Sequence, residues 1–169
     1  TNKILKKYKD IKNLKIINNS KNLGLPSSIN KAIHGSSGRY IVRVDSDDYV
    51  DRYFLFLLSY FLSNNREYGA VSCDYIIVND KEEFLQKKNS LKNEIACGIM
   101  FRREALIDVG LYNKNFSMRE GHELKKRFEK KYEIARIPFQ LYKYRKHSSN
   151  RTKNIKLLKR FDKQLEKTK

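Results

Sequence analysis

The chain has 169 residues, of which 40% are hydrophobic, so it is long enough to bury a core and too apolar to be intrinsically disordered. Its 37 lysines and arginines outnumber 19 aspartates and glutamates, and the formal net charge of +18 would suit a polyanionic partner such as nucleic acid or an acidic membrane surface. The longest apolar run, residues 54–58, is too short to cross a bilayer, and the N-terminus lacks the pattern of a signal peptide, so we expect no membrane-spanning segment in this sequence.

The first part of the chain alternates between expected helices and strands. Residues 2–9 carry apolar side chains at helical spacing, and residues 14–17 form a short apolar run typical of a strand. The serines at 27–28 can cap a second helix, which we expect to stop in the glycine-containing segment 35–38. The β-branched run 40–44 then predicts a buried strand.

The rest of the chain continues this alternation, with one polar interruption at residues 79–93 that we expect to be a surface excursion. Helices are expected at 53–62, at 103–109 with Gly110 as its end, and at 120–131. Strands are expected at 70–78, at 95–101 and, on both sides of Pro138, within 132–144. The basic segment 153–169 should be an amphipathic helix or a frayed tail. Such alternation predicts a largely parallel sheet covered by helices.

The excess of basic residues does not by itself indicate nucleic-acid binding. The lysines are spread along the whole chain, which favours a solvated basic surface, and the compositional bias of a genome would explain them without any function. The aromatic residues lie mostly in apolar runs, as with Phe54, Phe56, Phe61 and Phe101, where core packing is the simpler explanation. A diphosphate-bearing or membrane-bound substrate is the alternative reason for the positive charge.

Cys73 and Cys97 lie in hydrophobic stretches, without the short paired spacing of a metal knuckle. We therefore expect buried, reduced thiols rather than a disulfide or a zinc site. Reduced thiols in turn indicate a reducing compartment.

Three carboxylates, Asp45, Asp47 and Asp48, directly follow the expected strand 40–44. Crowding carboxylates at the end of a buried strand is electrostatically costly unless a cation is present. Carboxylate oxygens suit Mg2+ or Mn2+, and a partly open site of this kind could hold a nucleotide diphosphate. The alternative is an acidic turn that caps the next helix.

Several short elements in order resemble the motifs N-x-G, R/S-x-N, A-x-G-x-Y-I and D-x-D-D of family 2 glycosyltransferases. They are Asn22-Leu-Gly24, then Asn30, Ala32 and Gly38-Arg-Tyr-Ile41, then Asp45-Ser-Asp-Asp48. Further along, Cys97-Gly-Ile-Met-Phe-Arg-Arg-Glu-Ala105 with Val109-Gly-Leu-Tyr112 resembles the acceptor side of that family, and Tyr142-Lys-Tyr-Arg-Lys-His147 resembles its closing Y-R-x-H segment. The resemblance covers about residues 1–152.

The resemblance implies an α/β protein of the GT-A type, with a Rossmann-like mixed sheet sandwiched by helices over residues 1–152 and a basic helix or tail over 153–169. It implies that Asp47 ligates Mn2+ or Mg2+ and that Asp45 contacts the nucleoside or its ribose. His147 would add a metal or diphosphate contact. The further nucleotide-sugar contacts that it implies are Asn22 and Asn30.

The family's catalytic base would fall in Glu120-Gly-His-Glu-Leu124, which with Arg127 resembles the motif E-D-x-E-L-x-x-R. The aspartate of that motif normally deprotonates the acceptor hydroxyl, and here the position is Gly121. Glu120 is the nearest replacement, with His122 and Glu123 as rivals. The structural alternative is that Glu120 only caps a helix.

A second departure concerns the start of the chain. Members of this family usually begin with a strand, a helix and a D-D-x-S-x-D stretch that binds the nucleobase. The resemblance here starts just after that stretch, and Thr1-Asn2 would be its remnant. We therefore expect the fold to be truncated at its N-terminus, with apolar surface exposed where strands are missing.

The leading hypothesis is a metal-dependent, inverting glycosyltransferase that moves a sugar from a nucleoside-diphosphate sugar to a hydroxyl of a glycan or lipid-linked acceptor. One alternative is a truncated or degenerate domain without activity, and another is a basic module that binds nucleic acid or an anionic membrane. We expect a cytoplasmic protein without a nucleic-acid partner. The alternative location is the inner face of the membrane, by peripheral association.

Overall fold

The computed structural model describes residues 2–8, 10–148, 150 and 153–168. A short helix α1 (Asn2–Leu5) and a 3-10 turn (Lys6–Tyr8) come first. The remaining helices are α2 (Leu25–His34), α3 (Phe54–Asn64), α4 (Arg103–Asp108), α5 (Glu120–Phe128) and α6 (Ile155–Glu166). The strands are β1 (Tyr40–Val42), β2 (Tyr49–Val50), β3 (Tyr68–Val78), β4 (Phe84–Lys88), β5 (Ile99–Arg102) and β6 (Glu133–Arg145).

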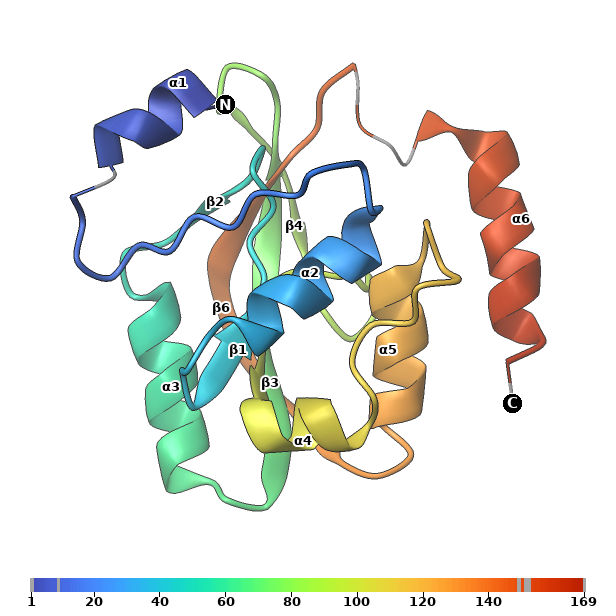
Figure 1. Ribbon diagram of the computed structural model, residues 1–169. Helices are drawn as coiled ribbons and strands as arrows, with labels where there is room; N and C mark the ends of the chain where they lie inside the picture. Colours follow the sequence, from blue (N-terminus) through green and yellow to red (C-terminus); the bar gives the residue numbers. More distant parts are fainter. Residues whose placement is uncertain (1, 9, 149, 151–152, 169) are drawn as a thin grey trace.

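The strands form a mixed sheet in the order β1-β5-β3-β6-β2, which confirms the α/β fold with a mixed sheet (Figure 1). The long strand β3 is central: β6 pairs with it along its whole length, while β5 and β4 pair with successive parts of its other edge. Among the strand pairs of the described residues, β3–β6 alone is parallel, so the expectation of a largely parallel sheet is wrong. The reason is that the short connection between β3 and β4 reverses the chain, whereas a parallel pair needs a longer crossover. Strand β5 keeps the direction of β4 and pairs antiparallel with both β3 and β1.

Helices cover both faces of the sheet, and the period of two along β3 decides which side chains each face receives. Val71, Cys73 and Tyr75 point toward α3, whose Phe54, Leu58 and Leu62 are fully buried. Ala70 joins the opposite core, which is built on α2, α4 and α5. This arrangement confirms the expected sheet between helical layers, with α2 crossing one face in Figure 1.

Two expected strands and one expected surface excursion differ in the structure. Residues 14–17 are not in the sheet, because a four-residue apolar run becomes a strand only beside a partner. The strand expected over 95–101 begins only at Ile99, because Gly98 has a φ of 74° that breaks the extended conformation before it. The segment 79–93 contains the exposed strand β4, which pairs with β3 despite its polar sequence.

The other expected elements appear close to their predicted positions, including one strand that contains a proline. Pro138 lies within β6 where the register against β3 shifts between Cys73 and Asp74, so its missing N–H interrupts no regular pairing. Cys73 and Cys97 are free and buried, as expected. Phe56 was expected in the core but is 60% exposed and stacks on Tyr60 on the outer side of α3.

The basic C-terminal segment forms a helix rather than a frayed tail. Its N-terminus is capped by the Asn154 side chain, which accepts a hydrogen bond from the Leu157 amide at 3.0 Å. Phe161 is buried in a small cluster with Phe116 and Met118, so α6 docks on the loop that precedes α5. Within the described residues, no helix combines the length and apolar character that crossing a bilayer requires.

Candidate active site

A cavity of about 690 Å³ opens at the C-terminal end of β1. Four segments that are distant in the sequence contribute most of its lining. They are residues 43–48 after β1, the irregular segment 94–97, residues 118–122 at the start of α5, and Leu158 of α6. The size is in the range of small-molecule binding sites, and several titratable side chains converge on it.

Asp48 is the structural anchor of the acidic cluster. Tyr142, buried in the core, donates its hydroxyl to Asp48 Oδ2 at 2.6 Å, and the Arg145 amide donates to Oδ1 at 2.9 Å. Burial nevertheless raises the pKa of Asp48, because it outweighs these bonds and neighbouring carboxylates add to the shift. The carboxylate therefore ties the turn after β1 to strand β6.

Asp47 is the carboxylate best placed to meet a ligand. Its side chain is 37% exposed, and His147 Nε2 lies 2.8 Å from Oδ2. Burial alone would raise the pKa of Asp47, but the His147 hydrogen bond and the charge of Arg145 lower it below its ordinary value. Asp47 is therefore ionised at neutral pH. The structure brings together the two residues that were predicted to bind the metal.

Asp45 and Glu120 are joined by Arg43, a residue that the sequence analysis did not select. The Arg43 guanidinium donates to both oxygens of Asp45, at 2.7 and 2.9 Å, and to Glu120 Oε1 at 2.8 Å. Burial would lower the pKa of Arg43, but these two carboxylates keep it raised. An arginine inside the apolar run of a strand is the signal that could have identified it, since a buried charge needs a partner.

Glu120 and its two rivals occupy different environments. Glu120 lines the cavity from the first position of α5, and His122 lines it nearby, where burial and the charge of Arg119 lower its pKa. Glu123 is 1% exposed and accepts two hydrogen bonds from Arg127, at 2.7 and 2.8 Å. Glu123 therefore stabilises α5, whereas Glu120 and the neutral His122 can each reach a ligand.

Gly121 is required by close packing against the segment 94–97. A Cβ added at Gly121 would lie 2.3 Å from Ala96 Cβ and 2.8 Å from Ala96 Cα. An aspartate at this position, as in the family motif, therefore needs a different course of residues 94–97. The backbone around the cavity therefore fits the glycine at position 121 and leaves no room for the aspartate of the family motif.

Replacing Gly121 by alanine tests this packing. Helix propensity alone would make alanine more stable by up to about 1 kcal/mol, whereas overpacking costs about 1–3 kcal/mol. We expect the free energy of unfolding in urea to fall. The double variant with Ala96→Gly should recover part of the loss, because one of the two close contacts disappears. Higher stability of the single variant would contradict this packing.

Asn22 and Asn30, predicted to contact the nucleotide sugar, do not line the cavity. Asn22 Oδ1 accepts the Gly24 amide at 2.9 Å and so shapes the turn before α2. Asn30 is buried, and its amide group exchanges hydrogen bonds of 2.8 and 3.0 Å with the backbone of Tyr112. Both side chains hold backbone in place, and we leave them out of the proposed site.

Two comparisons identify the family and the fold. The model of glycosyl transferase family 2 matches residues 1–110, which is more than half of the chain. The chain belongs to glycosyl transferase family 2. The matched part contains the acidic cluster, while Glu120 and His147 lie beyond it. No curated protein matches the sequence.

Solved glycosyltransferase structures share the fold of this family 2 domain. S. aureus TarS 1-349 in complex with UDP-GlcNAc superposes with a TM-score of 0.71 and 18% identity over 90% of this chain and 48% of the TarS 1-349 chain. The mannosyltransferase PcManGT from Pyrobaculum calidifontis, in complex with GDP-Man and Mn2+, gives a TM-score of 0.59 and 17% identity over 81% of this chain and 41% of that one. The domain thus spans about half the length of these structures.

The family 2 domain contains two groups of side chains that could hold a cation. In the described residues, ligand atoms of Asp45, Asp48 and Cys97 lie within 4.8 Å of one another. The carboxylates of this group already accept hydrogen bonds from Arg43, Tyr142 and Arg145. Burial raises the pKa of the Cys97 thiol to about 12, so it is protonated at neutral pH. This group is a poor ligand set for a hard cation.

The second group is Asp47 with His147. It offers an ionised, half-exposed carboxylate that lines the cavity and an imidazole nitrogen 2.8 Å from that carboxylate. Oxygen and imidazole ligands together suit Mn2+, and a site with two protein ligands leaves positions for a diphosphate. The residues present therefore fit the metal that the family resemblance implied.

Proposed function

We propose that this chain is the donor-binding and catalytic part of an enzyme that transfers a sugar from a nucleoside-diphosphate sugar to a hydroxyl of a glycan or lipid-linked acceptor. The observation that carries the proposal is the contact between Asp47 and His147 at the edge of a cavity in a family 2 domain. Mn2+ or Mg2+ held by these two residues would neutralise charge on the leaving diphosphate.

The other groups of the cavity have separate tasks in this proposal. Asp45, oriented by Arg43, accepts hydrogen bonds from the nucleoside or its ribose. Glu120 accepts the proton of the acceptor hydroxyl as that oxygen bonds to the anomeric carbon. The bond from that carbon to the phosphate oxygen breaks on the opposite face, so the configuration inverts and the nucleoside diphosphate leaves. His122 is the alternative base, because its lowered pKa keeps the imidazole neutral.

A second candidate function is binding without transfer. Glu120 is held by Arg43 at 2.8 Å, so one of its carboxylate oxygens is already engaged in an ion pair and is not free to meet an acceptor hydroxyl. Gly121 stands where the family has its usual base. A domain that binds a nucleotide sugar but does not transfer it would follow if the Arg43–Glu120 pair persists with an acceptor present.

The free, buried thiols support a reducing compartment, so we place either form of the protein, catalytic or binding only, in the cytoplasm.

Calorimetric titration tests the proposal directly. This chain, with and without Mn2+, is titrated with a panel of uridine, guanosine, thymidine and cytidine diphosphate sugars. We expect one nucleotide class to bind only with the metal, and transfer is then measured as release of the nucleoside diphosphate with a panel of acceptors. Failure of every donor to bind in Mn2+ would overturn the enzymatic proposal, and binding without any release would favour the second candidate.

A further inference from the structure

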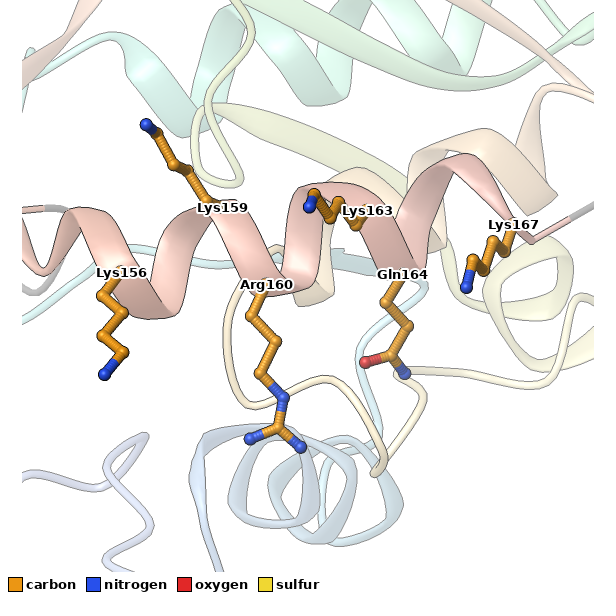
Figure 2. A pocket seen from close by; sticks show the side chains of 6 residues that line it. All are labelled: Lys156, Lys159, Arg160, Lys163, Gln164 and Lys167. Carbon is orange, nitrogen blue, oxygen red and sulfur yellow. The ribbon is translucent and has the colours of Figure 1, made fainter.

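The two faces of α6 differ sharply in charge. Leu157, Leu158, Phe161 and Leu165 form its inner face against the body of the protein. Five cations fall within an arc of about 100° on the opposite side, at the roughly 100° per residue of an α-helix. They are Lys156, Lys159, Arg160, Lys163 and Lys167, all exposed and lining one groove, and we call them the α6 basic face (Figure 2).

The α6 basic face is not neutralised by neighbouring acids. Asp162 turns to the body of the protein, where Arg119 binds it at 2.6 Å, and Glu166 lies at the edge of the arc. Among the described residues, no carboxylate lies within 4.0 Å of any of the five cations. Like charges three or four residues apart each destabilise a helix by about 0.2–0.5 kcal/mol, so this face lowers the stability of α6.

We propose that the α6 basic face attaches the protein to an anionic phospholipid surface. The five cations extend over about 17 Å of a helix on the outside of the fold, as Figure 1 shows, which suits contact with a flat layer of headgroups. Four of the five are lysines, which act as point charges in a diffuse field, whereas arginine is preferred where single phosphates are recognised bidentately.

Single-stranded nucleic acid fits this face less well. Such partners are bound by basic grooves with aromatic side chains on which bases stack. The one aromatic residue of α6, Phe161, is 6% exposed and packs against Phe116 at 5.9 Å between ring centroids. The apolar face is likewise used inside the protein, so α6 lies on the headgroups without inserting. Attachment is therefore electrostatic and sensitive to salt.

This contact would place the candidate active site beside the membrane. Leu158 lines the cavity from the inner face of α6, and Arg119, which also lines the cavity, is bound to Asp162. Lipid attachment does not depend on sugar transfer, and each can fail without the other.

The test is co-sedimentation of this chain with vesicles of phosphatidylcholine that contain about 30% phosphatidylglycerol. The α6 variant replaces the five cations of the basic face by glutamine. The control variant replaces five exposed lysines elsewhere, Lys81, Lys87, Lys92, Lys114 and Lys130, so both have the same net charge. At about 1 kcal/mol per cation near such a surface, we expect the partition coefficient of the α6 variant to fall at least about 100-fold, and that of the control much less.

A chemical footprint of the unaltered protein tests the same lipid contact without relying on the folding of the variants. Acetylation of lysines is followed by mass spectrometry with and without vesicles, and Lys156 and Lys163 should be protected while Lys87 and Lys114 are not. Equal loss of binding in both variants, no protection of α6, or no binding to the anionic vesicles would overturn the proposal. Tighter binding to a DNA oligonucleotide than to the vesicles, lost in the α6 variant, would assign the face to nucleic acid instead.

Discussion

Replacing Asp47 by alanine is expected to abolish Mn2+-dependent binding of the nucleotide sugar. Asp47 is a partly exposed carboxylate of the cluster and lies 2.8 Å from His147. Loss of residues that only support a metal ligand already weakens metal affinity by about 10–100-fold, so loss of the ligand itself should cost at least about 100-fold. Isothermal titration with Mn2+, alone and with the donor, measures the change.

The matched control for this change is Asp80→Ala, which removes an exposed carboxylate in the loop after β3 and should leave metal binding unaltered. His147→Ala should weaken Mn2+ binding less than Asp47→Ala. Near-normal binding by Asp47→Ala would assign the cation to Asp45, Asp48 and Cys97 instead. Cys97→Ser would then lower the affinity.

Replacing Glu120 by glutamine is expected to lower transfer by at least about 100-fold while leaving donor binding within about twofold. Glutamine keeps an oxygen that can accept the Arg43 hydrogen bond, so the arginine and the Asp45 that it orients stay in place. The amide cannot take a proton from the acceptor. Single-turnover transfer and donor calorimetry on the same preparation separate the two effects.

Two further variants decide between the candidate bases. Glu123→Gln should act on folding, because it removes the charge of a buried carboxylate that pairs with the partly exposed Arg127, and removing one partner of a buried ion pair costs up to about 3–5 kcal/mol. His122→Ala should leave transfer within a few-fold of normal if Glu120 is the base. A large loss with His122→Ala and a small one with Glu120→Gln would transfer the role to the imidazole.

The order of the elements was available from the sequence, because hydrophobic periodicity is a local property. Phe54, Leu58 and Leu62 recur at helical spacing, and the β-branched run before Asp45 marks a strand. The direction of the strands was not available. It depended on which strands pair, since β5 lies antiparallel between β1 and β3, and β4 formed from a polar segment because the edge of β3 was open to it.

The acidic cluster was also evident in the sequence, because its three carboxylates are neighbours and follow a strand. The separate roles of the three carboxylates were not evident in the sequence. The structure ties Asp48 to the core through Tyr142 and leaves Asp47 exposed. Whether a carboxylate serves packing or ligands depends on groups that the sequence does not place beside it.

Contacts between distant parts of the chain were decided by the tertiary structure alone. Arg43 and Glu120 are 77 positions apart, and Asp47 and His147 are 100 positions apart, yet each pair is separated by only 2.8 Å. The family motif pointed to His147, whereas the position of Arg43 inside an apolar run marked only a charge that needs a partner and did not say which carboxylates it joins. Gly121 seemed in sequence a lost carboxylate, and in the fold its hydrogen is what lets Ala96 pack against α5. Residue types and their local spacing determined the helices and strands of this protein, while long-range packing determined which charged side chains pair with one another.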